Sequence, residues 1–113
     1  MITYNCTIQE GVISGEQREI LNVRLVQIGA AVLGVPQDDI TVSYEIIPHG
    51  FGFRGGEIST SSSVRSRIPD GCSQEKRVEF MQAVQDMWME VTGQTTDELV
   101  VGAADASYRN YQE

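Results

Sequence analysis

Residues 14–42 read SGEQREILNVRLVQIGAAVLGVPQDDITV, and residues 73–101 repeat the same pattern as SQEKRVEFMQAVQDMWMEVTGQTTDELVV. The two stretches align without a gap, so that Ser14 falls on Ser73 and Gly34 falls on Gly93. The other matched pairs are Glu16 with Glu75, Asp38 with Asp97, Ile40 with Leu99, and Val42 with Val101. Self-similarity at a fixed period indicates that one supersecondary unit occurs twice.

Each copy carries the signals of a strand, a helix and a second strand. Serine is a preferred helix N-cap, and glycine is the usual residue just past a helix end, so helices are expected between Ser14 and Gly34 and between Ser73 and Gly93. The strands expected before and after the first helix are residues 2–8 and 40–45, both with alternating polarity. The sequence therefore predicts two β-α-β units, at about 2–50 and 62–105, within one domain spanning residues 1–113.

These units define an expected fold class, α/β (α+β). Strands joined through a helix run parallel, and the crossover is right-handed, so a four-stranded sheet with both helices on one face is predicted. Ile40, Val42, Leu99 and Val101 are apolar in a sheet too small to cover itself, which predicts packing against identical subunits. Residues 48–56 and the hydroxyl-rich run 59–63 are expected to be irregular.

Composition narrows the classes of partner. The chain has 113 residues with sixteen acidic and eight basic side chains, a net charge of −8 that repels nucleic-acid phosphates and anionic lipid. No apolar run approaches the roughly 20 residues that span a bilayer, and no targeting segment is evident, so a cytoplasmic protein is expected. Cys6 and Cys72 lack metal-like spacing and are expected to be reduced thiols; no metal or cofactor is expected.

A doubled β-α-β unit with a glycine-rich loop after its second strand resembles the tautomerase superfamily. The segment LGVPQDDITVSYEIIPHGFGFRGGE (residues 33–57) is similar to a stretch of 4-oxalocrotonate tautomerase (4-OT), sharing the proline, the glycine pair and the closing acid. The chain also resembles the malonate semialdehyde decarboxylase group. The shared features are Gly-Val-Pro with an acid shortly after it at Asp39, the pair Ser66-Arg67 before the second helix, and the residues SQEK at the start of that helix. This resemblance implies a homotrimer that acts on small carboxylates.

The family's catalytic N-terminal proline aligns with Ile2, and Met1 is expected to be retained before this large residue. The resemblance therefore puts Met1 and Ile2 at the catalytic position, with a primary amine in place of the proline. It also matches Asp39 to the acid that assists catalysis in the decarboxylases, and Arg67 to one of their carboxylate-binding arginines. Pro69 stands where their second arginine would be. The 4-OT arginines correspond to Val12 and Thr41.

Arg65 and Arg67 are two apart on an expected strand, so they share a face and could hold a carboxylate together. His49, Phe51 and Arg54 lie on the glycine-rich loop, which in family members shapes the site across a subunit boundary. The alternative is that both arginines are surface residues balancing nearby acids, that Asp39 is a turn or cap residue, and that His49 is an ordinary surface side chain.

Two functions remain open on these grounds. One is an enzyme that acts on a small oxo acid or similar carboxylate through a remodelled site, as a decarboxylase, hydratase or tautomerase. The other is a non-catalytic trimer that keeps the scaffold for ligand binding or assembly. A fold resemblance does not by itself choose between them.

Overall fold

A computed structural model describes residues 1–108 of the chain. The strands are β1 (Ile2–Gln9), β2 (Ile40–Ile47), β3 (Phe53–Arg54), β4 (Glu57–Ile58), β5 (Ser62–Ile68) and β6 (Leu99–Asp105). The helices are α1 (Gly15–Leu33) and α2 (Gln74–Thr92), and short 3-10 turns, η1 (Gln37–Asp39) and η2 (Thr96–Glu98), precede β2 and β6. The predicted duplication is visible in this order of elements.

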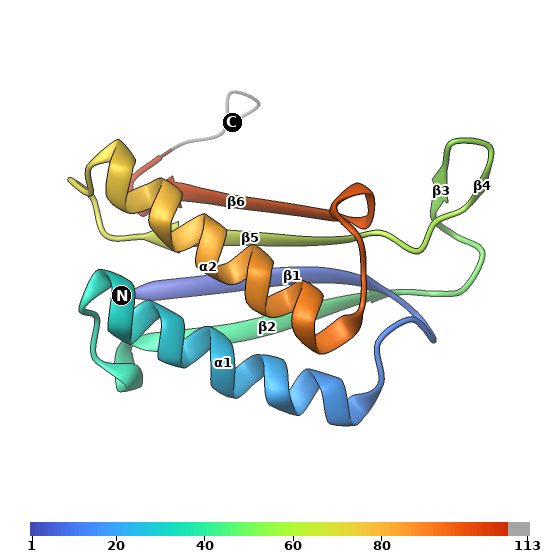
Figure 1. Cartoon of the computed structure of the whole chain (residues 1–113), viewed down its shortest axis with the longest axis horizontal. Coiled ribbons are helices and arrows are strands. Elements are labelled where there is room, and N and C mark those ends of the chain that lie inside the picture. Colours follow the sequence, from blue (N-terminus) through green and yellow to red (C-terminus); the bar gives the residue numbers. More distant parts are fainter. Residues whose placement is uncertain (109–113) are drawn as a thin grey trace.

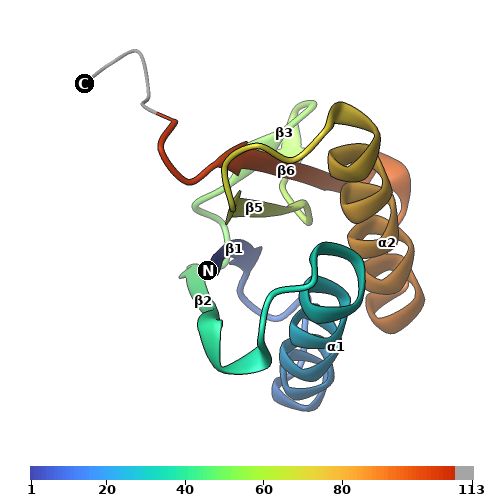
Figure 2. The ribbon, with the colours of Figure 1, turned by 90° about the vertical axis from the view of Figure 1, so that its left-hand side faces the viewer.

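Four strands form the main sheet in the order β2-β1-β5-β6. β1 pairs with β2 in parallel, β5 pairs with β6 in parallel, and the two units meet where β1 runs antiparallel to β5. Both helices lie on one face of this sheet, and the opposite face, here called the open face, carries no helix (Figures 1 and 2). The predicted fold class is confirmed.

The predicted caps hold both helices. Ser14 Oγ accepts a hydrogen bond from Gln17 N at 3.1 Å, and Gln17 Oε1 accepts one from Ser14 N at 2.8 Å, which completes a capping box. Ser73 Oγ accepts from Lys76 N at 3.1 Å in the second unit. The helices end at Gly34 and Gly93, whose φ angles of 69° and 77° are left-handed and favour glycine over residues with a Cβ.

The core lies between the sheet and the helices. Alternate side chains of β1 point toward the helices and are buried against both of them. The largest fully buried side chains are Trp88, Tyr4, Phe80, Ile2, Ile8, Leu21 and Leu25. Gly29 lets α1 approach the sheet closely, because a Cβ there would lie 2.8 Å from Ile2 Cδ1 and 2.9 Å from Ile40 Cδ1.

Two local predictions were wrong. Residues 48–56 are not wholly irregular, since β3 pairs with β4 across Gly55 and Gly56, whose φ angles of 59° and 85° suit a two-residue hairpin turn. The hydroxyl run 59–63 is also partly regular, because β5 begins at Ser62 and pairs with β6 from there. The residues from β3 to β4 form an arm that projects beyond the end of the main sheet (Figure 1).

The premise of the interface prediction was also wrong. Ile40 and Leu99 are buried, and Val42 and Val101 pack against the same core, so these four side chains face the helices. The open face carries mostly hydroxyl, amide and charged side chains, because the strand alternation places these polar residues there, although the exposed Val100 of β6 also lies on it. Within residues 1–108, neither helix is long and apolar enough to cross a membrane.

Candidate functional site

Pairing across the sheet gathers polar residues in rows on the open face. Asn5 of β1 lies opposite Ser43 of β2 and Arg65 of β5, and Arg65 in turn lies opposite Gly102 of β6. One row further along, Arg67 lies between Thr3 and Ala104. Each arginine is therefore flanked by a polar residue on one side and a small residue on the other.

The two arginines line a single hollow of about 390 Å³ between β5 and β6, called here the β5–β6 hollow. Its lining residues are Asn5, Arg65, Ser66, Arg67, Gly102, Ala103, Ala104 and Tyr108. Space exists because β6 presents small residues, and a Cβ added at Gly102 would meet no atom within 4 Å. The two arginines, predicted to share a strand face, thus lie in one concavity.

Arg67 is held in place by the chain that follows β6. Its Nη1 donates to Tyr108 O at 2.7 Å and to Asp105 O at 3.3 Å, and its guanidinium lies 5.5 Å from the centre of the Tyr108 ring. Ser107 N in turn donates to Asp70 Oδ1 at 3.0 Å, and hydrogen bonds from Ser107 lower the pKa of the Asp70 carboxyl. The Arg67 side chain is consequently pre-positioned, and within residues 1–108 its Nη2 and Nε make no hydrogen bond.

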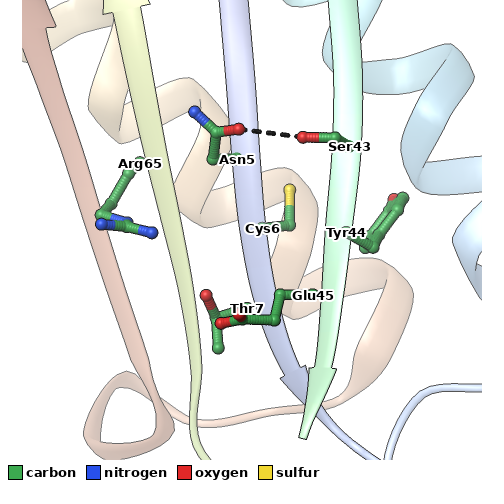
Figure 3. A pocket seen from close by; sticks show the side chains of 7 residues that line it. All are labelled: Asn5, Cys6, Thr7, Ser43, Tyr44, Glu45 and Arg65. Atoms are coloured by element: carbon green, nitrogen blue, oxygen red, sulfur yellow. Dashed lines mark hydrogen bonds between the residues drawn. The ribbon is translucent and has the colours of Figure 1, made fainter.

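Arg65 is exposed, and within residues 1–108 it makes no ion pair and no side-chain hydrogen bond. Figure 3 shows Arg65 beside a second, smaller hollow. This hollow has a volume of about 200 Å³ and shares the lining residues Asn5 and Arg65 with the β5–β6 hollow. Ser43 Oγ donates to Asn5 Oδ1 at 2.9 Å there, and Glu45 lies on the same face. Within the described residues, all the guanidinium donors of Arg65 are therefore open to an anion, whereas Arg67 uses Nη1 in its own chain.

Four residues at this surface were missed by the sequence analysis: Asn5, Ser43, Glu45 and Tyr108. The alternation of β1 and β2 could have placed Asn5, Ser43 and Glu45 on the face opposite the core. Tyr108 carries no such signal, because it follows β6 and reaches Arg67 only through the fold.

Met1, Ile2 and Asp39 lie at the end of the sheet where Arg67 also lies. Ile2 is fully buried against Gly29 and pairs with Ile40, whereas Met1 is exposed. Asp39 is exposed in η1, and its N–H donates to Pro36 O at 2.9 Å. Since β1 stands between β2 and β5, Asp39 is roughly 10 Å across the sheet from Arg67. It does not line the β5–β6 hollow of its own protomer.

His49, Phe51 and Arg54 lie at the opposite end, in and before the β3–β4 arm (Figure 1). Phe51 is 80% exposed, and the backbone N–H of His49 donates to Glu10 Oε1 at 3.0 Å. Within one protomer these residues are therefore separated from Arg67 by the length of the sheet. They would share a site with it only through another copy of the chain.

The buried Tyr4 and Cys6 and the half-buried Tyr44, on the helix side, carry no chemistry for this site. Burial raises the pKa of the Cys6 thiol to about 12, and burial also raises the pKa of Tyr4 and Tyr44. These groups stay protonated at neutral pH, and Tyr4 Oη donates to Leu25 O at 2.8 Å. In the part of the chain that the structure describes, no cluster of His, Cys, Asp and Glu could hold a metal ion.

Solved structures with the same architecture identify the fold. The native protein Ps01740 superposes with a TM-score of 0.86 at 28% identity, over 91% of this chain and 92% of that one. A symmetric trimer of wild-type fused 4-OT superposes at 0.81 with 15% identity, over 91% and 84%. The chain has the tautomerase-superfamily fold.

A further neighbour with the tautomerase fold is Pt0534 inactivated by 2-oxo-3-pentynoate. It superposes with a TM-score of 0.83 at 22% identity, over 91% of this chain and 84% of that one. No protein-family model matches the chain, and no curated protein sequence does. The tautomerase fold is thus shown by structure rather than by sequence.

Proposed function

We propose that this tautomerase-fold chain binds a small carboxylate, an oxo acid being the favoured class, in the β5–β6 hollow. The observation that carries the proposal is the presence of two guanidinium groups, Arg65 and Arg67, in one concavity over small residues of β6. Arginine presents a planar fork of donors that matches a carboxylate, and such charge-assisted bonds are stronger than neutral ones. In a chain of net charge −8, such a pair is a local exception that selects for anions.

The size of the hollow and one neighbour agree with this ligand class. About 390 Å³ lies within the range of small-molecule sites and suits a compact ligand. Pt0534 is inactivated by 2-oxo-3-pentynoate, which is a small oxo acid. In our proposal the ligand carboxylate accepts hydrogen bonds from the guanidinium groups of Arg65 and Arg67. The side-chain amide of Asn5, which also lines the hollow, contacts the ligand as well.

The lining favours binding over proton transfer, because the described residues around the hollow include neither a carboxylate nor an imidazole. We propose that any decarboxylase, hydratase or tautomerase activity uses a remodelled site, in which the Met1 amine and the Asp39 carboxylate supply the reacting groups at the end of the sheet where Arg67 lies. The alternative, a non-catalytic ligand-binding or scaffold trimer, is favoured by the use of Arg67 Nη1 within its own chain.

Calorimetric titration with pyruvate and oxaloacetate tests the binding proposal. Arg67→Ala is expected to weaken binding tenfold or more, since a hydrogen bond to a charged group contributes about 1.5–3 kcal/mol and about 1.4 kcal/mol is a factor of ten. Arg24→Ala is the control, because Arg24 lies on α1, across the sheet from the open face. Equal weakening by both substitutions would indicate a diffuse charge effect and reject the site.

We also propose that the protein is a homotrimer in which the β3–β4 arm contacts the next protomer. Phe51 is 80% exposed and Phe53 is 72% exposed, and Ile58, which pairs with Phe53, is also exposed. A two-stranded hairpin is marginal alone, and clustered exposed apolar side chains mark interaction surfaces. The fused 4-OT neighbour is a symmetric trimer.

Light scattering at micromolar concentration is therefore expected to give the mass of three chains. Phe51→Ser with Phe53→Ser should shift the population toward monomers, because the arm then loses its apolar contact. Val78→Ser, at an exposed apolar position on α2, is the matched control and should leave the mass unchanged. A monomer mass for the unmodified protein would contradict this assembly.

A further inference from the structure

Helix α1 carries apolar side chains on the side turned away from the sheet as well as on the side that packs against it. Leu21 and Leu25 are buried toward the sheet, whereas Ile20 is 49% exposed and Val23 is 57% exposed, one helical turn apart on the outer side. The exposed pair lines a surface hollow of about 510 Å³. Its lining, called here the α1 outer face, consists of Glu16, Glu19, Ile20, Val23, Arg24 and Gln27.

The duplication of the chain supplies an internal comparison for this face. In the ungapped repeat, Ile20 corresponds to Glu79 of α2 and Val23 corresponds to Gln82. Both counterparts are exposed and polar, as expected of a helix side that faces water. Among the residues of α2, only Val78 is large, apolar and exposed. The first unit thus has an adjacent apolar pair where the second has water-facing residues, which points to a partner for α1.

Two residues of opposite charge flank the apolar pair. Ile20 and Val23 have the spacing of heptad positions a and d, which puts Glu19 at position g and Arg24 at position e. In the described part of the chain, Glu19 makes no ion pair and no side-chain hydrogen bond. Arg24 Nη2 lies 3.8 Å from Glu90 Oε2, a weak and exposed contact. Both flanking charges can therefore meet a partner.

This pattern fits a second copy of α1 that lies parallel to the first. In a parallel pair of helices, position g of one helix meets position e of its partner, five residues further along. Glu19 of each copy would then meet Arg24 of the other, so a two-fold axis gives two opposite-charge contacts beside the apolar pair. In an antiparallel pair g meets g and e meets e, so Glu19 and Arg24 would not meet.

We propose that the α1 outer face docks on the same face of a second copy of the chain, in parallel orientation about a two-fold axis. One helix face offers far less contact than the roughly 800 Å² per partner of a standard stable interface, and the net charge of −8 on each copy opposes association. The pairing is therefore weak and forms only well above micromolar concentration, where a trimer mass is expected. It is independent of carboxylate binding, because α1 lies across the sheet from the open face (Figure 2).

Disulfide trapping tests this pairing, because it detects a weak and transient contact. The two-fold axis brings Val23 next to Val23 of the other copy, so Val23→Cys in a Cys72→Ser background should form a disulfide-linked pair under mild oxidation. Gln82→Cys in the same background is the matched control, since Gln82 is exposed at the corresponding position of α2. Pairing raises the local thiol concentration, so the Val23→Cys protein should crosslink at least about tenfold faster. Non-reducing gel electrophoresis measures both rates, each normalised to the reaction of that thiol with a small reagent.

Charge exchange then tests the parallel orientation. Adding Glu19→Arg to the Val23→Cys protein places arginine opposite Arg24 in both contacts and should slow crosslinking about tenfold. Adding Arg24→Glu as well restores opposite charges and should return the rate close to that of the Val23→Cys protein. Equal rates for the Val23→Cys and Gln82→Cys proteins would overturn the proposal. A rate that Glu19→Arg leaves unchanged, or that the double exchange fails to restore, would overturn it too.

Discussion

The Arg65→Ala, Arg67→Ala double variant is expected to lose at least about 100-fold in carboxylate affinity. Each arginine offers a charge-assisted contact of about 1.5–3 kcal/mol, and two such contacts together correspond to two or more factors of ten. Their positions on one strand, roughly 7 Å apart, allow both to reach a small ligand. Calorimetry with pyruvate and oxaloacetate, or competition where binding becomes too weak, measures the loss.

Replacement by lysine separates geometry from charge at the same two positions. The Arg65→Lys, Arg67→Lys protein keeps the net charge but loses the planar fork of donors, so it should recover only part of the affinity. Full recovery would mean that the hollow acts as a diffuse positive surface. Unchanged binding by the double alanine variant would place the ligand elsewhere.

Gln94→Leu is expected to destabilise the fold by about 3 kcal/mol. Gln94 Oε1 accepts from Trp88 Nε1 at 2.8 Å and from Ser62 Oγ at 3.0 Å, and its Nε2 donates to Thr60 O at 2.7 Å. Leucine would remove the hydrogen bonds of two buried residues, Trp88 and Ser62, and each unsatisfied buried group costs about 1–3 kcal/mol. For a domain of this size the melting temperature should fall by roughly 10–20 °C.

Scanning calorimetry at equal protomer concentration measures this effect, since assembly makes the melting temperature depend on concentration. Gln82→Leu is the matched control, because Gln82 is exposed on α2 and, among residues 1–108, its side chain bonds only Asp86, at 2.8 Å. It should change stability by less than about 0.5 kcal/mol. Equal destabilisation by both substitutions would contradict a structural role for the Gln94 network.

Local signals were enough to predict the fold. The capping serines, the glycines after each helix and the alternation of β1 depend only on neighbours in sequence, so Ser14, Gly34 and their partners in the repeat could be placed directly. Parallel pairing followed from the helical connection between strands. The duplication then fixed the second unit from the first.

The missed features depend on contacts between distant parts of the chain. Val42 and Val101 were assigned to an uncovered surface, because a strand pattern does not state which face the helices cover. The Gln94 network joins α2 to the start of β5, and Tyr108 meets Arg67 from beyond β6. None of these contacts leaves a periodic trace in the sequence.

The β3–β4 hairpin was missed for a different reason. Glycine-rich segments are usually irregular, yet Gly55 and Gly56 supply the two positive φ angles that a tight hairpin needs. The flanking strands have only two residues each, too few for an alternating pattern to show.

The most direct test of carboxylate binding follows the arginine side chains themselves during a titration with pyruvate. NMR spectra of the Nε–Hε groups report each guanidinium separately. The proposed site predicts saturable shifts at Arg65 and Arg67, with Arg18 and Arg24 on the helical side unchanged. Shifts spread evenly over all arginines, or saturation that leaves Arg65 and Arg67 unmoved, would contradict it.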